Sequence, residues 1–270
     1  LVERIFVPVN RGNSCEIHTF NTDGSGYKFL NFGFYKTFDH VHPVKSKKDT
    51  LLLSYKRGSN QSLSYFYNWE KDTITDSLVE SSSSQMVAND EFKMFAFIRF
   101  DKSGKTSIIV CDEKFNALTR LVSDKTEYSL PRFGGLENVL FYVENAIDSN
   151  DKFTIKSVNL NDLVTKTVFE LINRPEDMYV SAKSEIMIKI RNKNGENELI
   201  SINADNGNSK SVLKSKKEII CVGWSSDGQS SFFTKQTGFS GRNIYASFTK
   251  SDGKMSFKSI KDEKGNKMKI

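Results

Sequence analysis

In this chain of 270 residues, two of the three histidines have a spacing that could place them in a metal site. His40 and His42 stand two residues apart beside Asp39, so a strand would place both imidazoles on one face. Two imidazoles and a carboxylate could begin a metal site. The sequence has only one further histidine, His18, and no Cys/His cluster completes a ligand set. We therefore expect no metal and no cofactor, and we expect His40 and His42 to line a channel or to bond loop backbone.

Serine and carboxylate chemistry has weaker signals. "GWSSDG" and "GFSGR" place serines between glycines, but neither matches the Gly-x-Ser-x-Gly elbow, which also needs a strand-to-helix turn. "NADNGNS" and "DSNDK" lack the acid spacing of a calcium loop, and ordinary Asn and Asp turn chemistry explains them. Paired glycosidase carboxylates could still converge from distant positions. We expect no enzyme; a carbohydrate-active hydrolase or lyase with acids and histidines in a channel is the alternative.

Alternating apolar and polar residues indicate the elements that would position these groups. "EIHTF", residues 16–20, alternates at period two, which is typical of a half-buried strand, and Asp23-Gly24 then signals a hairpin turn. The same unit of apolar strand, polar loop and alternating strand recurs six times. Its first strands begin near residues 5, 51, 93, 139, 186 and 231. A spacing of roughly 42–47 residues is that of a four-stranded propeller blade.

We therefore predict an all-β fold: a six-bladed β-propeller of four-stranded antiparallel blades, in one domain covering 1–270. The expected blades cover residues 1–38, 39–82, 83–126, 127–175, 176–217 and 218–266. The candidates for the innermost strands of blades two to six are "HVHPV", "SQMVA", "SLPRF", "DMYVS" and "IICVGW", and no such segment precedes "RIFVPV" in blade one. We expect "KMKI", residues 267–270, to become the innermost strand of blade one, because closing the ring removes exposed sheet edges.

Several segments resemble a known repeat. "RGNSCEIHTFNTDGSGYKFL" resembles the TolB-type propeller repeat, in which a Gly-Asn loop, a strand near Glu-Ile-Tyr and an Asp-Gly-Ser turn follow one another. "GWSSDGQSSFF" resembles the Trp-Ser-Pro-Asp-Gly element of these WD-like repeats, with Ser226 in place of proline. "HVHPV" keeps a proline, Pro43, but "KSKKD" replaces the residues that usually follow it. "GFSGRNIYASFTKSDGKMSF" is similar to propeller repeats of Bacteroidota envelope proteins that carry peptidoglycan-binding domains.

What the resemblance implies is a periplasmic or secreted scaffold that binds other proteins. The TolB protein has an additional N-terminal domain that these residues do not include, so we expect no role in a Tol-Pal system. The sequence begins at Leu1 without Met, so we expect a mature form or an excised domain, from which any signal peptide or lipid anchor would have been removed. The expected partner is a protein. The alternative is a carbohydrate-active or peptidase-associated propeller that binds a glycan, peptidoglycan or a peptide in its central channel.

Aromatic and arginine residues are the candidate anchors for that partner. Trp, Tyr and Arg are the residues most enriched at interaction hot spots. Those at or near the expected innermost strands are Tyr128, Arg132, Tyr179 and Trp224, and Arg242 lies in the loop "GFSGR". With His40 and His42, these residues form the candidate binding set at a channel mouth. For each of these aromatic and arginine residues, the alternative is that the side chain packs between blades and contacts no partner.

Charge and cysteine content narrow the classes of partner. The net charge of +6 admits an anionic partner, but the lysines are scattered, as in "SKKD" and "KSKKE", and not gathered with aromatics on one face. We therefore expect no nucleic acid. No stretch approaches the ~20 apolar residues of a transmembrane helix. Cys15, Cys111 and Cys221 are far apart, and we expect them to be free, buried thiols.

Overall fold

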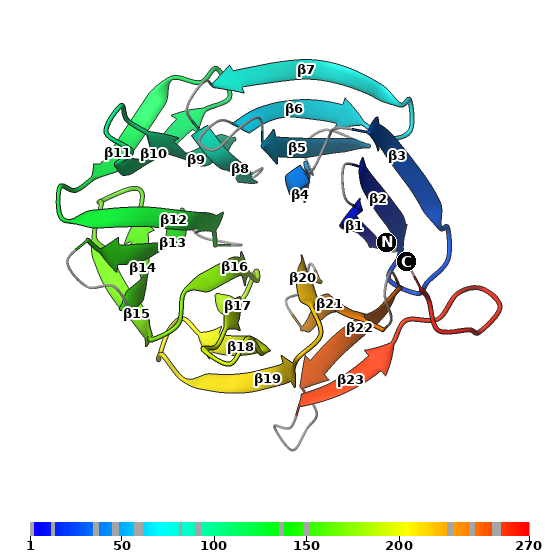
Figure 1. Cartoon of the computed structure of the whole chain (residues 1–270). Coiled ribbons are helices and arrows are strands. Elements are labelled where there is room, and N and C mark those ends of the chain that lie inside the picture. Colours follow the sequence, from blue (N-terminus) through cyan, green and yellow to red (C-terminus); the bar gives the residue numbers. More distant parts are fainter. Residues whose placement is uncertain are drawn as a thin grey trace.

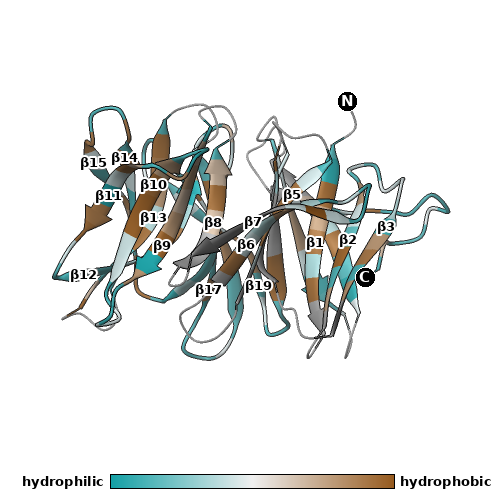
Figure 2. Ribbon diagram, turned by 90° about the horizontal axis from the view of Figure 1, so that it is seen from above, coloured by the Kyte–Doolittle hydropathy of each residue, from teal (hydrophilic) through white to brown (hydrophobic). Residues whose placement is uncertain are grey.

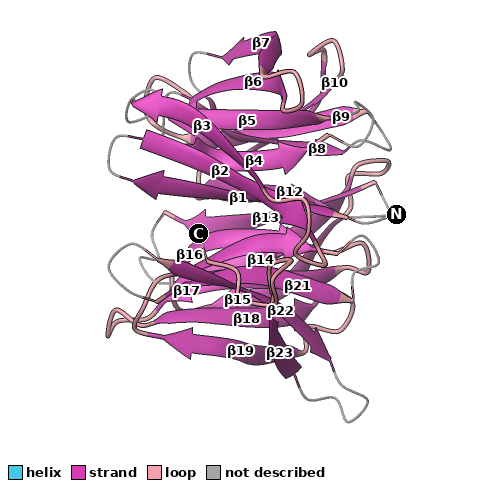
Figure 3. Cartoon of the chain, turned by 90° about the vertical axis from the view of Figure 1, so that its right-hand side faces the viewer, coloured by secondary structure: helices cyan, strands magenta, loops and turns pink. Residues whose placement is uncertain are grey.

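The chain forms an all-β, six-bladed propeller around a central axis in the computed structural model (Figure 1). The structure describes residues 3–11, 14–34, 38–44, 49–56, 62–80, 83–89, 93–134, 138–147, 152–225, 229–237, 241–249 and 255–269. Within these ranges the regular elements are strands and there is no helix (Figure 3). The same described residues therefore contain no helix that could cross a membrane.

Each blade is one antiparallel sheet. Blade one contains β1 (Arg4–Arg11), β2 (Ser14–Asn21) and β3 (Lys28–Phe34). Blade two contains β4 (Phe38–Pro43), β5 (Thr50–Lys56), β6 (Ser62–Asn68) and β7 (Thr73–Glu80). Blade three contains β8 (Ser83–Asn89), β9 (Met94–Phe100), β10 (Thr106–Asp112) and β11 (Ala117–Val122).

The second half of the ring repeats this order. Blade four contains β12 (Thr126–Phe133), β13 (Val139–Ala146), β14 (Phe153–Asn159) and β15 (Thr165–Leu171). Blade five contains β16 (Pro175–Val180), β17 (Glu185–Arg191), β18 (Asn197–Asn203) and β19 (Ser209–Ser215). Blade six contains β20 (Ile219–Trp224), β21 (Ser230–Gln236), β22 (Arg242–Thr249) and β23 (Met255–Ser259).

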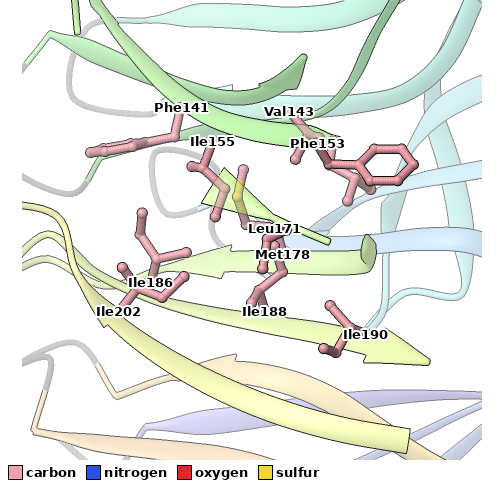
Figure 4. Packing of buried hydrophobic residues seen from close by; sticks show 11 residues of the cluster. Phe141, Val143, Phe153, Ile155, Leu171, Met178, Ile186, Ile188, Ile190 and Ile202 are labelled. Atoms are coloured by element: carbon pink, nitrogen blue, oxygen red, sulfur yellow. The ribbon is translucent and has the colours of Figure 1, made fainter. Parts of the chain in front are cut away.

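The core lies between the blades, so the middle strands bury both of their faces. In β2, Cys15 and Ile17 pack towards blade two, whereas Phe20 packs towards blade six. Figure 4 shows the cluster between blades four and five, where Ile155 faces Ile186 across the interface. Apolar residues follow the strands and polar residues gather in the turns (Figure 2). Cys15 and Cys111 are buried thiols that are not joined in a disulfide among the described residues; the side chain of Cys221 is outside the described residues.

One turn geometry recurs at the ends of several strands. In residues 21–25, 101–105, 112–116, 181–185, 192–196 and 262–266, the first carbonyl accepts the N–H of the fourth residue, and the first N–H donates to the fifth carbonyl. The fourth residue has positive φ and is Gly24, Gly104, Phe115, Ser184, Gly195 or Gly265. This is a type I turn followed by a left-handed residue. It explains why the regular alternation of residues 16–20 stops at Asp-Gly-Ser-Gly.

The C-terminal segment lies at blade six, and the closing strand expected in blade one is not confirmed. Lys269 forms an isolated antiparallel bridge with Asn243 of β22, and Lys261 forms one with Lys267. Among the described residues, blade one consequently has three strands, whereas each of the other blades has four. The physical reason is the turn 262–266, which reverses the chain just after blade six. Ile270 lies outside the described residues.

Blades one and six nevertheless meet closely. The turn after β2 approaches the C-terminal hairpin, where the N–H of Gly26 donates to Glu263 Oε1 at 3.1 Å. A Cβ atom on Gly24 would lie 1.7 Å from the carbonyl oxygen of Lys261. Met268 is buried in the same interface as Ile5, Val7, Val9, Phe20, Phe232, Ile244 and Ile260. The two end blades are therefore joined by side-chain packing and a turn, without a shared sheet.

Candidate functional site

Three predicted binding residues lie at the same end of successive innermost strands. Arg132 is the penultimate residue of β12, Tyr179 is the penultimate residue of β16, and Trp224 is the last residue of β20. These strands surround the axis and follow the same order within their blades, so they end on the same side of the ring (Figure 1). We call the region formed by Arg132, Asp177, Tyr179 and Trp224 the channel mouth.

Arg132 is buried and fastens β12 to β16. Its Nε donates to the Met178 carbonyl at 2.6 Å, and its Nη1 donates to the Pro131 carbonyl at 2.7 Å. Its Nη2 donates to Asp177 Oδ1 at 3.0 Å. The guanidinium carbon lies 5.5 Å from the centroid of the Tyr179 ring, within the range of a cation–π interaction. Arg132 therefore packs beside the Tyr179 ring, and its positive charge is paired with Asp177 within the protein.

An irregular stretch of β12 brings Arg132 to this position. The pairing of β12 with β13 shifts between Ser129 and Arg132, and Leu130 has a φ of +50°. A positive φ is uncommon for a bulky residue, and bulges are a known means of re-aiming a side chain. The bulge therefore accounts for the contact that Arg132 makes with blade five.

Asp177 is the acidic group of the channel mouth. Burial raises the pKa of its carboxyl group, and this effect outweighs the opposing effects of the Arg132 charge and of the hydrogen bond from Tyr179. Asp177 Oδ1 also accepts the N–H of Met178 at 2.9 Å. The carboxylate is thus enclosed by donors that hold it between two innermost strands, where it has little freedom to act on an outside molecule.

Tyr179 and Trp224 are the half-buried aromatic residues of the channel mouth. Both pack against one apolar cluster of Met187, Leu199, Val212, Ile219 and Phe233. The indole Nε1 of Trp224 is buried and has no hydrogen-bond partner among the described residues. Because the cluster fixes one side of each ring, the remaining ring surface is presented in a constant orientation.

Tyr128 and Arg242 lie apart from the channel mouth. Tyr128 is buried between blades three and four, where its ring meets Tyr142 edge-on at 5.7 Å, as the packing alternative supposed. Its N–H donates to Thr106 Oγ1 at 2.6 Å. Arg242 begins β22 and pairs with Glu218, the residue just before β20, so it lies near the opposite ends of the innermost strands.

The two histidines of β4 are placed only by their backbone. His40 lies opposite Ser54 and His42 opposite Leu52 in the ladder between β4 and β5, and the side chains of both histidines lie outside the described residues. Within the part of the chain that the structure describes, no three His, Cys, Asp or Glu residues are grouped so that they could hold a metal ion.

The sequence reading missed two polar groups. Asp177 was part of the expected inner strand "DMYVS", and an acid inside a buried strand was a signal that it needs a buried partner. His18 is buried, with Nδ1 2.8 Å from Tyr27 Oη and Nε2 3.2 Å from Glu16 Oε2. Both imidazole nitrogens therefore have partners within blade one.

Solved propellers share this fold. TolB from Acinetobacter baumannii aligns with a TM-score of 0.66 and 12% identity, over 94% of this chain and 62% of that chain. A TolB candidate from Agrobacterium tumefaciens aligns with a TM-score of 0.57 and 13% identity, over 85% of this chain and 83% of that chain. The WD40 domain of Toxoplasma gondii coronin aligns with a TM-score of 0.55 and 9% identity, over 94% of this chain and 67% of that chain.

These likenesses define the class of the protein. No protein-family model and no curated protein sequence matches the chain. The fold is that of a TolB-like β-propeller, as the repeat resemblance implied. This chain spans less than two thirds of the Acinetobacter baumannii TolB chain, and at this level of identity the likeness defines the fold without the activity.

Proposed function

We propose that the protein is a non-catalytic scaffold that binds a partner protein at the channel mouth. The observation that carries the proposal is the pair of half-buried aromatic rings, Tyr179 and Trp224, on adjacent innermost strands. Rings that are already fixed lose little conformational freedom on binding, and Trp and Tyr are frequent hot-spot residues.

The arrangement of groups at the channel mouth suggests how the partner would be recognised. The donors of Arg132 bond Pro131, Asp177 and Met178, so this arginine is held in place beside the Tyr179 ring. The partner would present an apolar residue to the exposed surfaces of the Tyr179 and Trp224 rings.

The compartment that we propose is the bacterial periplasm or the extracellular space, with a lipid anchor as one form of attachment. Support comes from the resemblance of "RGNSCEIHTFNTDGSGYKFL" to the TolB-type repeat, whose proteins act in the envelope. Immunodetection of the tagged natural protein in separated periplasmic, membrane and cytoplasmic fractions would test this part of the proposal. Recovery in the cytoplasmic fraction alone would contradict it.

Site-directed photocrosslinking in the source cells tests the binding proposal. A photoreactive residue at position 183, in the turn that follows β16, should crosslink a defined protein; one at position 258, on the outermost strand β23, should not. The double variant Tyr179→Ala/Trp224→Ala should weaken binding of that protein by about tenfold or more. Equal crosslinking from both positions, or unchanged affinity of a folded double variant, would contradict the proposal.

A further inference from the structure

We propose a second interaction surface, a basic patch at the end of blade five opposite the channel mouth, which binds an acidic segment of a partner protein. The patch consists of Arg174, Arg191, Lys193, Lys216 and Lys217. The inference goes beyond the function proposed above, because the patch lies where β16 and β20 begin, whereas Tyr179 and Trp224 lie where these strands end.

The strand register of blade five brings these cations together. Arg174 comes immediately before β16, and the start of β16 pairs with the end of β17, where Arg191 is the last residue. Arg191 lies opposite Asn197 of β18, and Asn197 lies opposite the last residue of β19, which Lys216 and Lys217 follow. Because neighbouring strands are about 4.8 Å apart, four strand ends gather the patch within roughly 15 Å.

The acids beside the patch are too few to neutralise it. Glu176 contacts Lys189 Nζ at 2.8 Å and Arg191 Nε at 3.2 Å, so one carboxylate serves two cations. Glu218, which follows the patch in the sequence, pairs with Arg242 of blade six. This end of blade five therefore keeps an excess of positive charge.

The excess charge is accessible. All five side chains of the patch are exposed, and Arg174 and Lys216 form no ion pair within the part of the chain that the structure describes. Lys217 Nζ donates to a backbone carbonyl at 3.3 Å, which leaves its charge without an acid. Glu196 Oε2 accepts a hydrogen bond from Asn192 Nδ2 at 3.4 Å. The patch can therefore attract carboxylates from outside.

The chemistry of the patch fits an extended acidic segment. Guanidinium groups bind carboxylates through two parallel hydrogen bonds, and lysines attract them as point charges. A patch about 15 Å wide matches about five residues of an extended chain at 3.3 Å per residue. Ile172 stands two residues before Arg174 and is 75% exposed, so it offers one apolar contact beside the cations. The segment is thus rich in Asp or Glu and includes an apolar residue.

The surroundings of the patch favour a protein segment over a membrane or a nucleic acid. At the same end of the ring, the side chain of Asp124 is 94% exposed and Glu127 is also exposed. An anionic bilayer lying against this end would meet both carboxylates. The residues 172–176, 191–197 and 215–219 include no aromatic side chain on which a base could stack. A single acidic segment can be confined to blade five.

Fluorescence anisotropy with a synthetic peptide tests the proposal. The probe is a fluorescein-labelled peptide with one leucine between two runs of three glutamates. It should bind the 270-residue chain, and added salt should weaken the binding, because exposed charges are screened. The same peptide with lysine in place of every glutamate should not bind.

Paired charge reversals locate the site. Arg174→Glu/Lys216→Glu should weaken peptide binding by about tenfold or more, because like charges would then face the peptide. Lys71→Glu/Lys114→Glu is the matched control, since it makes the same change in net charge at exposed turns of the channel-mouth end. The control should keep the affinity within about twofold. Circular dichroism should show that both variants remain folded.

Three outcomes would overturn the inference: no binding of the acidic peptide, equal weakening by the two charge-reversal pairs, or tighter binding of phosphatidylglycerol vesicles or an oligothymidylate than of the peptide. Tyr179→Ala/Trp224→Ala should leave peptide binding unchanged, because these rings lie at the other end of the ring. The second surface and the proposed function at the channel mouth can therefore fail independently of each other.

Discussion

At the scale of single residues, Gly24 determines how closely two blades approach. Its φ is +90°, and a Cβ atom at this position would lie 1.7 Å from the Lys261 carbonyl oxygen. A Cβ atom on Gly207, in the corresponding turn of blade five, would lie 3.2 Å from the Val168 carbonyl oxygen in the preceding blade, which is a tight contact but a milder one than at Gly24. In both places a glycine lets the outer part of one blade reach the turn of the next.

We expect Gly24→Ala to lower the free energy of unfolding by about 3 kcal/mol or more, because left-handed strain and a backbone clash add together. Gly104→Ala is the matched control, since Gly104 occupies the same turn position with a φ of +83° and no neighbouring atom within 4 Å. The control should cost only about 1–2 kcal/mol. Urea denaturation of both variants measures the difference, and equal losses would show that the contact with Lys261 is unimportant.

Leu163 shows the opposite case, a bulky side chain where glycine would be expected. The turns 159–164 and 203–208 have the same backbone hydrogen bonds, and Leu163 (φ +59°) stands where the second turn has Gly207 (φ +71°). Leu163 is also exposed, so little burial offsets the strain. The residue type at this position therefore lowers stability locally.

Leu163→Asn should raise the free energy of unfolding by about 0.5–1 kcal/mol, because asparagine adopts the left-handed conformation more readily. Val164→Asn, an exposed neighbour with no positive φ, is the control and should give no gain. Thermal unfolding of the two variants would show the contrast. A lower midpoint for Leu163→Asn would mean that the leucine makes a stabilising contact.

At the scale of elements, β12 and β16 are linked by the ion pair of buried Arg132 with half-buried Asp177 and by the bond from Arg132 to the Met178 carbonyl. Arg132 and Asp177 join strands that belong to different blades, and burial raises the pKa of Asp177. A raised pKa means that the folded state binds the proton more tightly than the unfolded state. Stability therefore falls as pH rises from 3.8, the ordinary value for aspartate, through the raised pKa.

We expect the unfolding free energy of the parent minus that of Asp177→Asn to decrease as pH rises above 3.8, because only the parent loses this proton. Asp112→Asn should show the opposite sign. Hydrogen bonds from Asn116 and backbone N–H groups lower the pKa of Asp112, so its contribution is lost as pH falls through the lowered value. Denaturation curves at several pH values would reveal both trends; a difference for Asp177 that grows with pH would contradict the assignment.

The elements themselves could be predicted from the sequence, whereas the contacts between them could not. Alternation and a constant period predict the strands, because both are local properties. The partner of Arg132 depends on a strand some 45 residues away and on the bulge at Leu130, which no local pattern reveals. The closing strand predicted for blade one is not confirmed. "DEKGN", residues 262–266, repeats the turn pattern of "DKSGK", residues 101–105, and this local pattern indicates that the chain reverses just after blade six.

At the scale of the whole molecule, the ring is held by face-to-face packing of neighbouring blades. Each blade touches mainly the blade before it and the blade after it, so stability is expected to depend on nearest-neighbour interfaces. The interface between blades one and six differs from the others, because blade one has no innermost strand within the described part of the chain and the hairpin 261–269 packs at the junction. It is therefore the place where the ring should open first.

This view predicts a localised effect for removing residues 267–270. The deletion takes Met268 out of the cluster that contains Ile5 and Phe232 and should cost about 2–5 kcal/mol, as large-to-small changes in a core do. Hydrogen exchange should accelerate in blades one and six before it does in blades three and four. The control, Lys267→Ala/Lys269→Ala, changes two exposed residues, retains Met268 and should behave like the parent. Uniform acceleration in all blades would mean that the propeller unfolds as one unit, and no acceleration would mean that β1 and β20 hold the ring without the hairpin.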